Sequence, residues 1–133
     1  MKPREMSASS GKGATCLNFE KPKRGEIWRV NFDPTTGTEI KKIRPAVVIS
    51  SDAIGKLPIK LVAPVTDWKE YFTGSLWHVK IEPDELNGLT KISAVDALQL
   101  HGMDTQRFVE KLGEVSAETL EQILLAIAVV IDY

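Results

Sequence analysis

The segment Arg44-Pro45-Ala46-Val47-Val48-Ile49-Ser50 predicts a central β-strand that starts at a charged side chain. Residues 46–49 form an unbroken apolar run rich in β-branched side chains, which is typical of a strand buried on both faces. Pro45 disfavours a helical backbone at Arg44, because the proline ring clashes with the residue before it. We therefore expect an extended Arg44 whose guanidinium leaves the core where the strand begins.

A second strand, predicted over residues 59–65, leads into Pro64-Val65-Thr66. Pro64 cannot donate a backbone hydrogen bond, so an edge or a bulge is expected near the end of this strand. If the two strands are neighbours, Arg44 and Thr66 share one pocket. A guanidinium fork and a hydroxyl group suit a phosphate better than almost any other ligand, so this pocket is a candidate phosphate site.

Residues 26–32 alternate in polarity, which predicts a half-buried strand. Its buried face is expected to carry Trp28, Val30 and Phe32, and its other face Ile27, Arg29 and Asn31. The loop that follows, residues 33–39, is polar and contains Pro and Gly breakers.

The rest of the chain predicts a mainly β protein with a C-terminal α-helix. Further strands are expected over residues 76–82, 92–100 and 108–115, and one helical turn within residues 67–72. Ser116 can cap a helix whose apolar side chains recur at helical spacing: Leu120, Ile123, Leu124, Ile127 and Ile131. About six short strands and one helix predict a small, strongly bent sheet or a partly open barrel.

The composition indicates one domain in a chain of 133 residues, of which 43% are hydrophobic. Residues 1–23 are polar and are expected to form a flexible extension, with the folded domain over residues 24–133. The single cysteine, Cys16, allows no disulfide framework and favours a reducing cytoplasm. We expect no signal peptide, and the longest apolar run, residues 123–131, is too short for a membrane span.

The charge is unevenly distributed, although the net charge is only −1. Residues 21–69 carry ten Lys/Arg and five Asp/Glu, whereas residues 70–133 carry four Lys/Arg and eleven Asp/Glu. Basic charge beside a candidate phosphate site indicates a groove for a polyanion, with an accidental imbalance of surface charge as the alternative.

Each candidate residue also has a purely structural interpretation. Arg44 could form an ion pair with Glu39 instead of binding a phosphate. Thr66 could be an ordinary strand residue, and Ser50 and Ser51 could form local turn hydrogen bonds. These alternatives remain open at the level of sequence.

Histidines and aromatic residues offer further candidates. His78 and His101 could form the acid–base pair of a ribonuclease, although no sequence spacing brings them together. Neither has Cys or carboxylate neighbours at the spacing of a metal site. Trp68, with Tyr71 and Phe72, could stack unpaired bases or could close one end of a barrel.

Several motifs together resemble the MazF/PemK toxins of bacterial toxin–antitoxin systems. The resemblance covers residues 24–131 and rests on these stretches: Arg24-Gly25-Glu26-Ile27-Trp28, Asp33-Pro34, Gly37-Thr38-Glu39, Arg44 to Ser50, Ala63 to Thr66, Gly88-Leu89, Ser93-Ala94-Val95, Gln99, Asp104, Arg107 and Lys111-Leu112-Gly113. It implies a small SH3-like barrel of the CcdB/PemK type. It also implies a homodimeric endoribonuclease that cuts single-stranded RNA without a metal or other cofactor, and that is bound by a cognate antitoxin.

The resemblance also assigns roles to particular residues. Arg44 and Thr66 match the family's catalytic pair, which implies cleavage by the 2′-hydroxyl to give 2′,3′-cyclic phosphate and 5′-hydroxyl ends. Glu39 is the candidate proton acceptor, because arginine stays protonated. The residues expected to contact RNA are Lys41, Lys42, Ser50, Ser51, Trp68, His78 and Gln99.

Two departures from the family pattern concern the strand edge near Gln99. Many relatives have an acidic residue at the position of Leu98 and an arginine at the position of His101, so specificity or activity could differ here. A CcdB-like gyrase poison on the same barrel is a second hypothesis, but such toxins use a Trp-containing C-terminal tail, and this chain ends in Ile131-Asp132-Tyr133. A weakened member that only binds RNA or a partner is a third.

Overall fold

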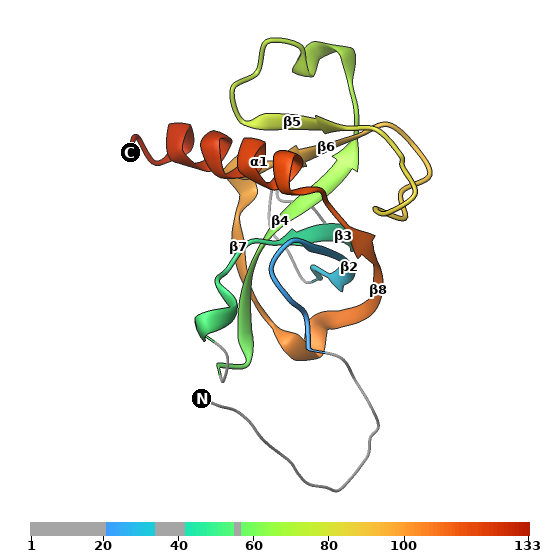
Figure 1. Ribbon diagram of the computed structural model, residues 1–133, viewed down its shortest axis with the longest axis vertical. Coiled ribbons are helices and arrows are strands. Elements are labelled where there is room, and N and C mark those ends of the chain that lie inside the picture. Colours follow the sequence, from blue (N-terminus) through green and yellow to red (C-terminus); the bar gives the residue numbers. More distant parts are fainter. Residues whose placement is uncertain (1–20, 34–41, 55–56) are drawn as a thin grey trace, which may run out of the picture.

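The computed structural model describes residues 21–33, 42–54 and 57–133. Within these residues, seven antiparallel strands form one strongly curved sheet with a single α-helix across it (Figure 1). The strands are β2 (Glu26–Asn31), β3 (Ile43–Val48), β4 (Ile59–Asp67), β5 (His78–Ile81), β6 (Ser93–Asp96), β7 (His101–Asp104) and β8 (Phe108–Glu114), and the helix is α1 (Ala117–Val130). The predicted fold class, mainly β with a C-terminal helix and an open barrel-like sheet, is confirmed.

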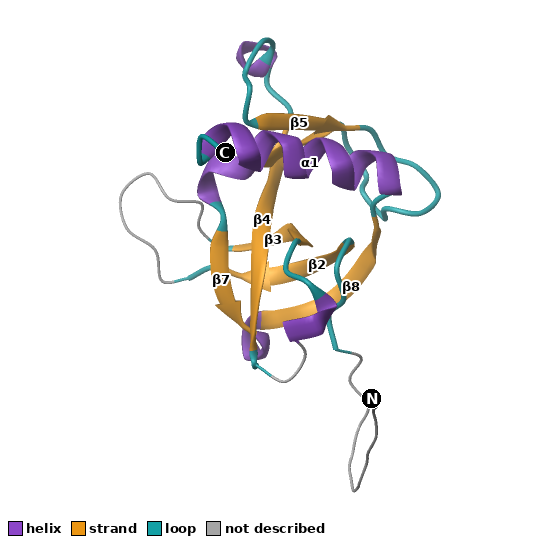
Figure 2. Ribbon diagram, turned by 60° about the vertical axis from the view of Figure 1, so that its left-hand side comes forward, coloured by secondary structure: helices purple, strands orange, loops and turns teal. Residues whose placement is uncertain are grey.

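The order of the strands is β5-β6-β4-β3-β2-β8, and β7 also pairs with β4. The long strand β4 changes partner along its length: it pairs with β7 from Ile59 to Val62 and with β6 from Val65 to Asp67. Pro64 lies between these two ladders, so its missing amide hydrogen removes no hydrogen bond to β7 or β6. The change of partner divides the sheet into a curled part and a smaller part under α1 (Figure 2).

Two hydrophobic clusters occupy the two sides of this sheet. The first lies between α1 and strands β3–β6 and includes Val65, Val79, Val95 and Ile123. The second fills the curled part and consists of Trp28, Val30, Phe32, Ala46, Val48, Val62 and Met103, with Phe108 packed against it. Residues of β4 therefore alternate between the two clusters, as the pleat of a strand requires.

The C-terminal helix begins as predicted. The Ser116 hydroxyl oxygen accepts a hydrogen bond from the Thr119 amide at 3.1 Å and so caps the first turn. Ile123 is fully buried, and Leu120, Leu124 and Ile127 pack against the first cluster. The helix is thus held by its apolar face on the sheet, which is where most helical stability in proteins comes from.

Two sequence-based predictions were wrong in detail. Ile27 is fully buried in the first cluster, so β2 is buried on both faces at that position and is not a half-exposed strand. Residues 92–100 are not one strand either, because β6 ends at Asp96 and a short helical turn, η3 (Ala97–Gln99), precedes β7. The Asp96 carboxylate accepts a hydrogen bond from the Leu98 amide, which stabilises this turn.

One buried carboxylate joins the first strand to the last. Glu26 accepts hydrogen bonds from the Trp28 indole at 2.9 Å and from the Lys23 amide at 2.8 Å, and its other oxygen lies 3.1 Å from Lys111 Nζ. Burial acts to raise the pKa of Glu26, but these hydrogen bonds and the charge of Lys111 outweigh it and lower the pKa below 4.5.

Residues 1–20 lie outside the described part of the chain, so the predicted extension over residues 1–23 remains a prediction. In the described residues, no helix is both long and apolar enough to cross a membrane.

Candidate functional site

Arg44 and Thr66 lie at facing positions on neighbouring strands. The register of β3 with β4 runs Val48–Val62, Val47–Ala63 and Ala46–Pro64, and two further residues along each strand bring Arg44 opposite Thr66. Both residues lie on the side of the second cluster, because side chains two positions apart share a face. Each side chain is partly exposed, so both are accessible to a ligand.

The same face continues across β6 and β5. Thr66 pairs with Ala94, and Ala94 pairs with Lys80, which is exposed. The opposite face carries Val65, Val79 and Val95 and is covered by α1. A row of side chains, Arg44, Thr66, Ala94 and Lys80, therefore crosses four strands on the side away from the helix, and two of its four members are cationic.

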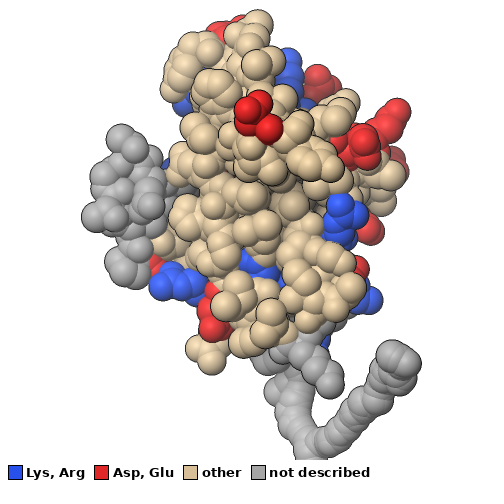
Figure 3. Space-filling model, turned by 90° about the vertical axis from the view of Figure 1, so that its left-hand side faces the viewer, with Lys and Arg blue, Asp and Glu red and all other residues tan. Residues whose placement is uncertain are grey.

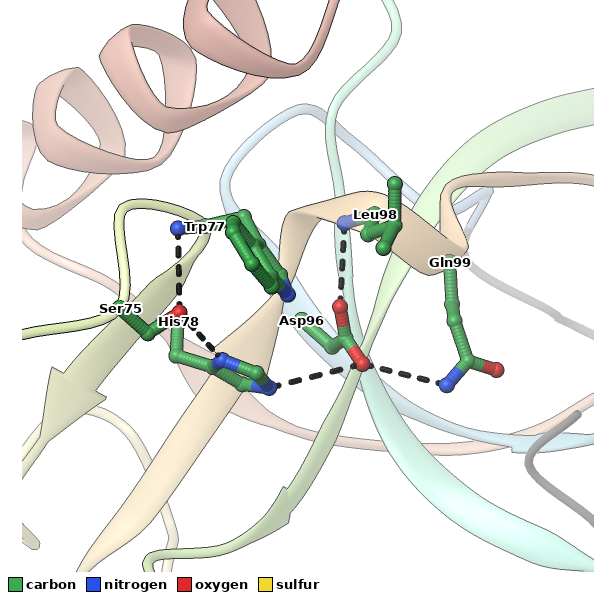
Figure 4. Close-up of polar contacts among 6 residues, drawn as sticks. All are labelled: Ser75, Trp77, His78, Asp96, Leu98 and Gln99. Atoms are coloured by element: carbon green, nitrogen blue, oxygen red, sulfur yellow. Dashed lines mark hydrogen bonds and ion pairs between the residues drawn. The ribbon is translucent and has the colours of Figure 1, made fainter. Parts of the chain in front are cut away.

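A buried polar network lies in the next row of this face (Figure 4). Asp96 Oδ2 accepts a hydrogen bond from Gln99 Nε2 at 3.1 Å and lies 3.7 Å from His78 Nε2. Asp96 Oδ1 accepts from the Leu98 amide at 3.0 Å, and His78 Nδ1 lies 2.7 Å from the Ser75 hydroxyl. The Asp96 and His78 side chains are only 10% and 11% exposed, so the negative charge of Asp96 is stabilised by these donors rather than by bulk water.

Aromatic rings pack around His78. The Phe72 ring stacks on the imidazole with centroids 3.8 Å apart, and Trp68 and Tyr71 contact Phe72 edge-on. Lys80 Nζ lies over the Trp68 ring at 5.1 Å. These contacts hold the short helical turn η2 (Glu70–Phe72) against the sheet, where one helical turn was predicted. Tyr71 is the ring of this cluster that is largely exposed, at 80%.

The two ends of the polar loop after β2 are fastened together. The Lys42 amide donates to Asp33 Oδ1 at 2.8 Å, and the Phe32 amide donates to the Lys42 carbonyl oxygen at 3.0 Å. Arg107 Nη1 donates to the carbonyl oxygens of Asn31 and Asp33. Lys42 thus lies at the base of this loop, two residues before Arg44, whereas Glu39 and Lys41 lie outside the described residues.

Other predicted residues lie farther along the strands from Arg44 and Thr66. Ser50 and Ser51 follow the far end of β3, where their hydroxyl oxygens accept hydrogen bonds from the Leu61 and Ala53 amides. The Ser51 contact is the local turn contact of the structural interpretation, whereas the Ser50 contact joins the end of β3 to β4. His101 starts β7, where its ring packs edge-on against Phe32 at 5.9 Å, and no described contact joins it to His78.

Charged groups do not form one continuous basic surface on the face shown in Figure 3. The centre of that face is mainly uncharged, and Lys/Arg and Asp/Glu side chains alternate around it. In the row described above, the positive charge comes from two individual residues, Arg44 and Lys80. Among the described residues, no three His, Cys, Asp or Glu side chains are grouped so that they could hold a metal ion.

Sequence reasoning missed Asp96, the residue with most contacts in the network of Figure 4. It lay within a stretch interpreted as one continuous strand. The signal present in the sequence was an ionisable residue inside an otherwise apolar strand, three residues before a glutamine, since a buried carboxylate needs donors close by.

Comparison with known proteins identifies the family of this chain. Residues 23–131 match the family described as PemK-like, MazF-like toxin of type II toxin-antitoxin system. The chain is 30% identical to the endoribonuclease toxin ChpB of Escherichia coli over 113 residues, which cover 83% of this chain and 94% of ChpB. It is 31% identical to the endoribonuclease MazF9 of Mycobacterium tuberculosis over 122 residues, covering 83% and 96% of the two chains.

Solved structures share the fold. MazF from Deinococcus radiodurans superposes with a TM-score of 0.73 at 26% identity, covering 86% of this chain and all of that one. A MazE-MazF complex from the same organism superposes with a TM-score of 0.67 at 26% identity, covering 86% and 98%. The resemblance noted in the sequence is thereby confirmed, and this chain belongs to the PemK-like, MazF-like toxins of type II toxin–antitoxin systems.

Proposed function

We propose that this toxin is an endoribonuclease that cleaves single-stranded RNA at a phosphate bound between Arg44 and Thr66. The observation that supports this most directly is the β3–β4 register: continued by two residues beyond its last pair, it sets Arg44 opposite Thr66 on one face of the sheet, and both residues are partly exposed. The relatives ChpB and MazF9 are named as endoribonucleases, which agrees with the proposal.

The reaction would use the 2′-hydroxyl of the RNA as nucleophile. It attacks the adjacent phosphorus in line, the bond to the 5′-oxygen of the next nucleotide breaks, and the products carry a 2′,3′-cyclic phosphate and a 5′-hydroxyl. Arg44 donates to the phosphorane oxygens, where negative charge builds up in the transition state. A single preorganised donor of this kind is worth about 3 kcal/mol.

Thr66 would donate its hydroxyl to the same oxygens or to the leaving 5′-oxygen. Arg44 cannot accept the 2′-hydroxyl proton, because a guanidinium remains protonated at any physiological pH. We assign that role to Glu39, on the loop whose base is fastened by Asp33, Lys42 and Arg107. The mechanism as proposed needs no metal ion or other cofactor.

The remaining assignments extend the same site. Lys41 and Lys42 would hold the RNA backbone, and Trp68 and Gln99 would contact bases. His78 is less favourably placed for the base contact expected of it, because its side chain is only 11% exposed and packs against Ser75, Asp96 and Phe72. Ser50 and Ser51 are less favourably placed, because they lie at the other end of β3, where their hydroxyl oxygens accept from the Leu61 and Ala53 amides. We further propose that the toxin works in the cytoplasm as a homodimer and binds a cognate antitoxin, by analogy with its relative in the MazE-MazF complex of Deinococcus radiodurans.

The test is cleavage of a long unstructured RNA by the purified protein in the presence of EDTA, followed by mapping of both new ends. We expect cyclic-phosphate and 5′-hydroxyl ends, lost in Arg44→Ala and in Thr66→Ala. Suitable controls are Arg29→Ala and Thr90→Ala, since Arg29 pairs with Glu110 at the surface and Thr90 is exposed elsewhere. A requirement for divalent metal would reject the mechanism, and undiminished cleavage by Arg44→Ala would reject the residue assignment.

A further inference from the structure

We propose that Lys80 binds the RNA phosphate next to the scissile one and so forms a second phosphate subsite of this nuclease. The inference rests on the proposed ribonuclease function, because the scissile phosphate is the one bound between Arg44 and Thr66. Lys80 would strengthen RNA binding and fix the placement of the RNA along the sheet, and it takes no part in the bond-breaking step.

Lys80 lies in line with Thr66 on the same face of the sheet. Thr66 pairs with Ala94, and Ala94 pairs with Lys80. Directly opposed residues of antiparallel strands have Cα atoms roughly 4.5–5.5 Å apart, so two such steps place the Cα atom of Lys80 about 10 Å from that of Thr66. The neighbouring residues Val65 and Val79 face α1, so the side chains of Thr66 and Lys80 both leave the sheet on the side away from the helix.

The Trp68 ring holds the Lys80 side chain over this face. Lys80 Nζ lies 5.1 Å from the centre of the Trp68 ring, and this cation–π contact spans β6, which lies between β5 and β4. Trp68 follows Thr66 by two residues, and its amide donates to the Ile92 carbonyl oxygen at 3.1 Å, so it continues the same face of the strand. Lys80 therefore extends across β6 toward the chain segment that carries Thr66.

The phosphate held by Lys80 would differ from the one held by Arg44. The strand order puts β3 on one side of β4 and β6 on the other, so Arg44 and Lys80 flank Thr66 from opposite sides. Trp68, which fixes the position of the ammonium group, lies two residues or roughly 7 Å beyond Thr66 along the chain. A phosphate bound between Arg44 and Thr66 thus leaves Lys80 for the next linkage of the same RNA.

The charge of Lys80 can serve a ligand. Lys80 is exposed and forms no ion pair within the described part of the chain, whereas Lys91 is paired with Asp67 and Lys111 with Glu26. The cation–π contact does not neutralise the ammonium group, whose N–H groups can donate to phosphate oxygens. Because the ring already restrains the lysine, less conformational entropy is lost when the phosphate binds.

The salt dependence of RNA binding measures how many phosphates the protein neutralises. The probe is a short single-stranded RNA with a cleavage site mapped with the unaltered protein, and a 2′-deoxynucleotide at the scissile position prevents cleavage. Each phosphate contact contributes about 0.7 to the slope of log K against log salt for single strands. Lys80→Gln should lower this slope by about 0.7 and weaken binding at low salt by about fivefold.

Lys91→Gln is the matched control for the loss of one positive charge. Lys91 Nζ lies 3.4 Å from Asp67, which alternates with Thr66 and so lies on the other face of β4. Lys91→Gln should bind the probe with the slope of the unaltered protein. An equal decrease of the slope in Lys80→Gln and Lys91→Gln would mean that only the net charge matters, and it would overturn the inference.

Methylphosphonates, which remove the charge of one linkage at a time, locate the subsite. At one of the two linkages that flank the scissile one, this change should weaken binding by the unaltered protein about fivefold. Lys80→Gln should no longer respond to the change at that linkage, whereas Lys91→Gln should respond as the unaltered protein does. Lys80→Arg keeps a cation that can pack on the Trp68 ring, so it should retain the response.

The outcomes separate this inference from the proposed function. If the unaltered protein cuts no RNA, or if Arg44→Ala cuts equally well, the ribonuclease site is wrong and the subsite with it. If Arg44→Ala is inactive but Lys80→Gln responds to every uncharged linkage as the unaltered protein does, only the role of Lys80 is wrong. Weaker binding of poly-glutamate by Lys80→Gln, with RNA binding unchanged, would assign Lys80 to an acidic protein partner and would also overturn the inference.

Discussion

Arg44 on β3 and Thr66 on β4 face one another two residues beyond the last paired position, Ala46–Pro64. β4 lies between β3 and β6 in the sheet; its ladder with β3 ends at Pro64, and its ladder with β6 runs from Val65 to Asp67. A charged fork and a hydroxyl group are thus carried by well-packed strands, each two residues beyond the last pair of their shared ladder. Rigid support with an open end is what a preorganised phosphate site requires.

Replacement of Arg44 by lysine should separate the effect of charge from that of geometry. Lysine keeps the positive charge but lacks the planar fork that binds two phosphate oxygens at once. We expect the single-turnover cleavage rate of Arg44→Lys to fall by about 100-fold, with a smaller change in RNA affinity. The control is Arg29→Lys, which alters a surface arginine of the neighbouring strand β2 that pairs with Glu110, and this variant should cleave normally.

Glu26 should make the stability of the fold sensitive to acid. Its pKa in the folded protein is lower than in the unfolded chain, so the carboxylate contributes stability above pH 4.5 and loses it as the pH falls through the folded value. Glu26→Gln should lower the free energy of unfolding in urea by about 1–3 kcal/mol at pH 7. The difference between the two proteins should shrink below pH 4, and a difference that grows on acidification would contradict the assignment.

Arg107 should stabilise the base of the loop that precedes Arg44. Its guanidinium donates to the carbonyl oxygens of Asn31 and Asp33, where the chain leaves β2. Arg107→Ala leaves these acceptors without that donor and should cost about 1–3 kcal/mol of stability. Hydrogen exchange of the Lys42 and Phe32 amides should accelerate more than that of Val47 in the core, and equal acceleration everywhere would indicate a purely global effect.

Gly113 should be indispensable for packing β8 against the preceding loop. A Cβ atom at this position would overlap the backbone of Leu86 and Asn87, which cannot move as a flexible side chain can. Gly113→Ala should therefore lower the free energy of unfolding by about 3 kcal/mol. Gly102→Ala on β7 is the matched control, because its Cβ would meet only a side-chain atom of Ile59 at 3.5 Å, an ordinary contact distance.

The sequence predicted the fold class and the two strands that carry Arg44 and Thr66 because both depend on local patterns. Apolar strands and the prolines at positions 45 and 64 place one polar residue at the start of a strand and another at the end of the next. That these two strands are neighbours follows from their short connection, and the facing register follows from the pleat.

What the sequence did not reveal depends on tertiary contacts. The end of β6 was missed because Asp96 starts a turn through its contact with the Leu98 amide, and β7, which follows this turn, was assigned to no element. The buried Asp96 carboxylate has its other contacts with His78, which comes from β5, and with Gln99 at the end of the turn, and such contacts between separate elements cannot be read from the sequence. Ile27 was assigned to an exposed face because alternation cannot show that a helix from the other end of the chain covers that face.

The convergence of Arg44 and Thr66 on one phosphate is tested most directly by a double-mutant cycle on single-turnover RNA cleavage. If both side chains stabilise the same transition state, Arg44→Ala with Thr66→Ala should lose much less activity than the product of the two single losses. The shared site would be contradicted if the two losses simply multiply in the double variant. It would also be contradicted if all three variants keep nearly full cleavage activity.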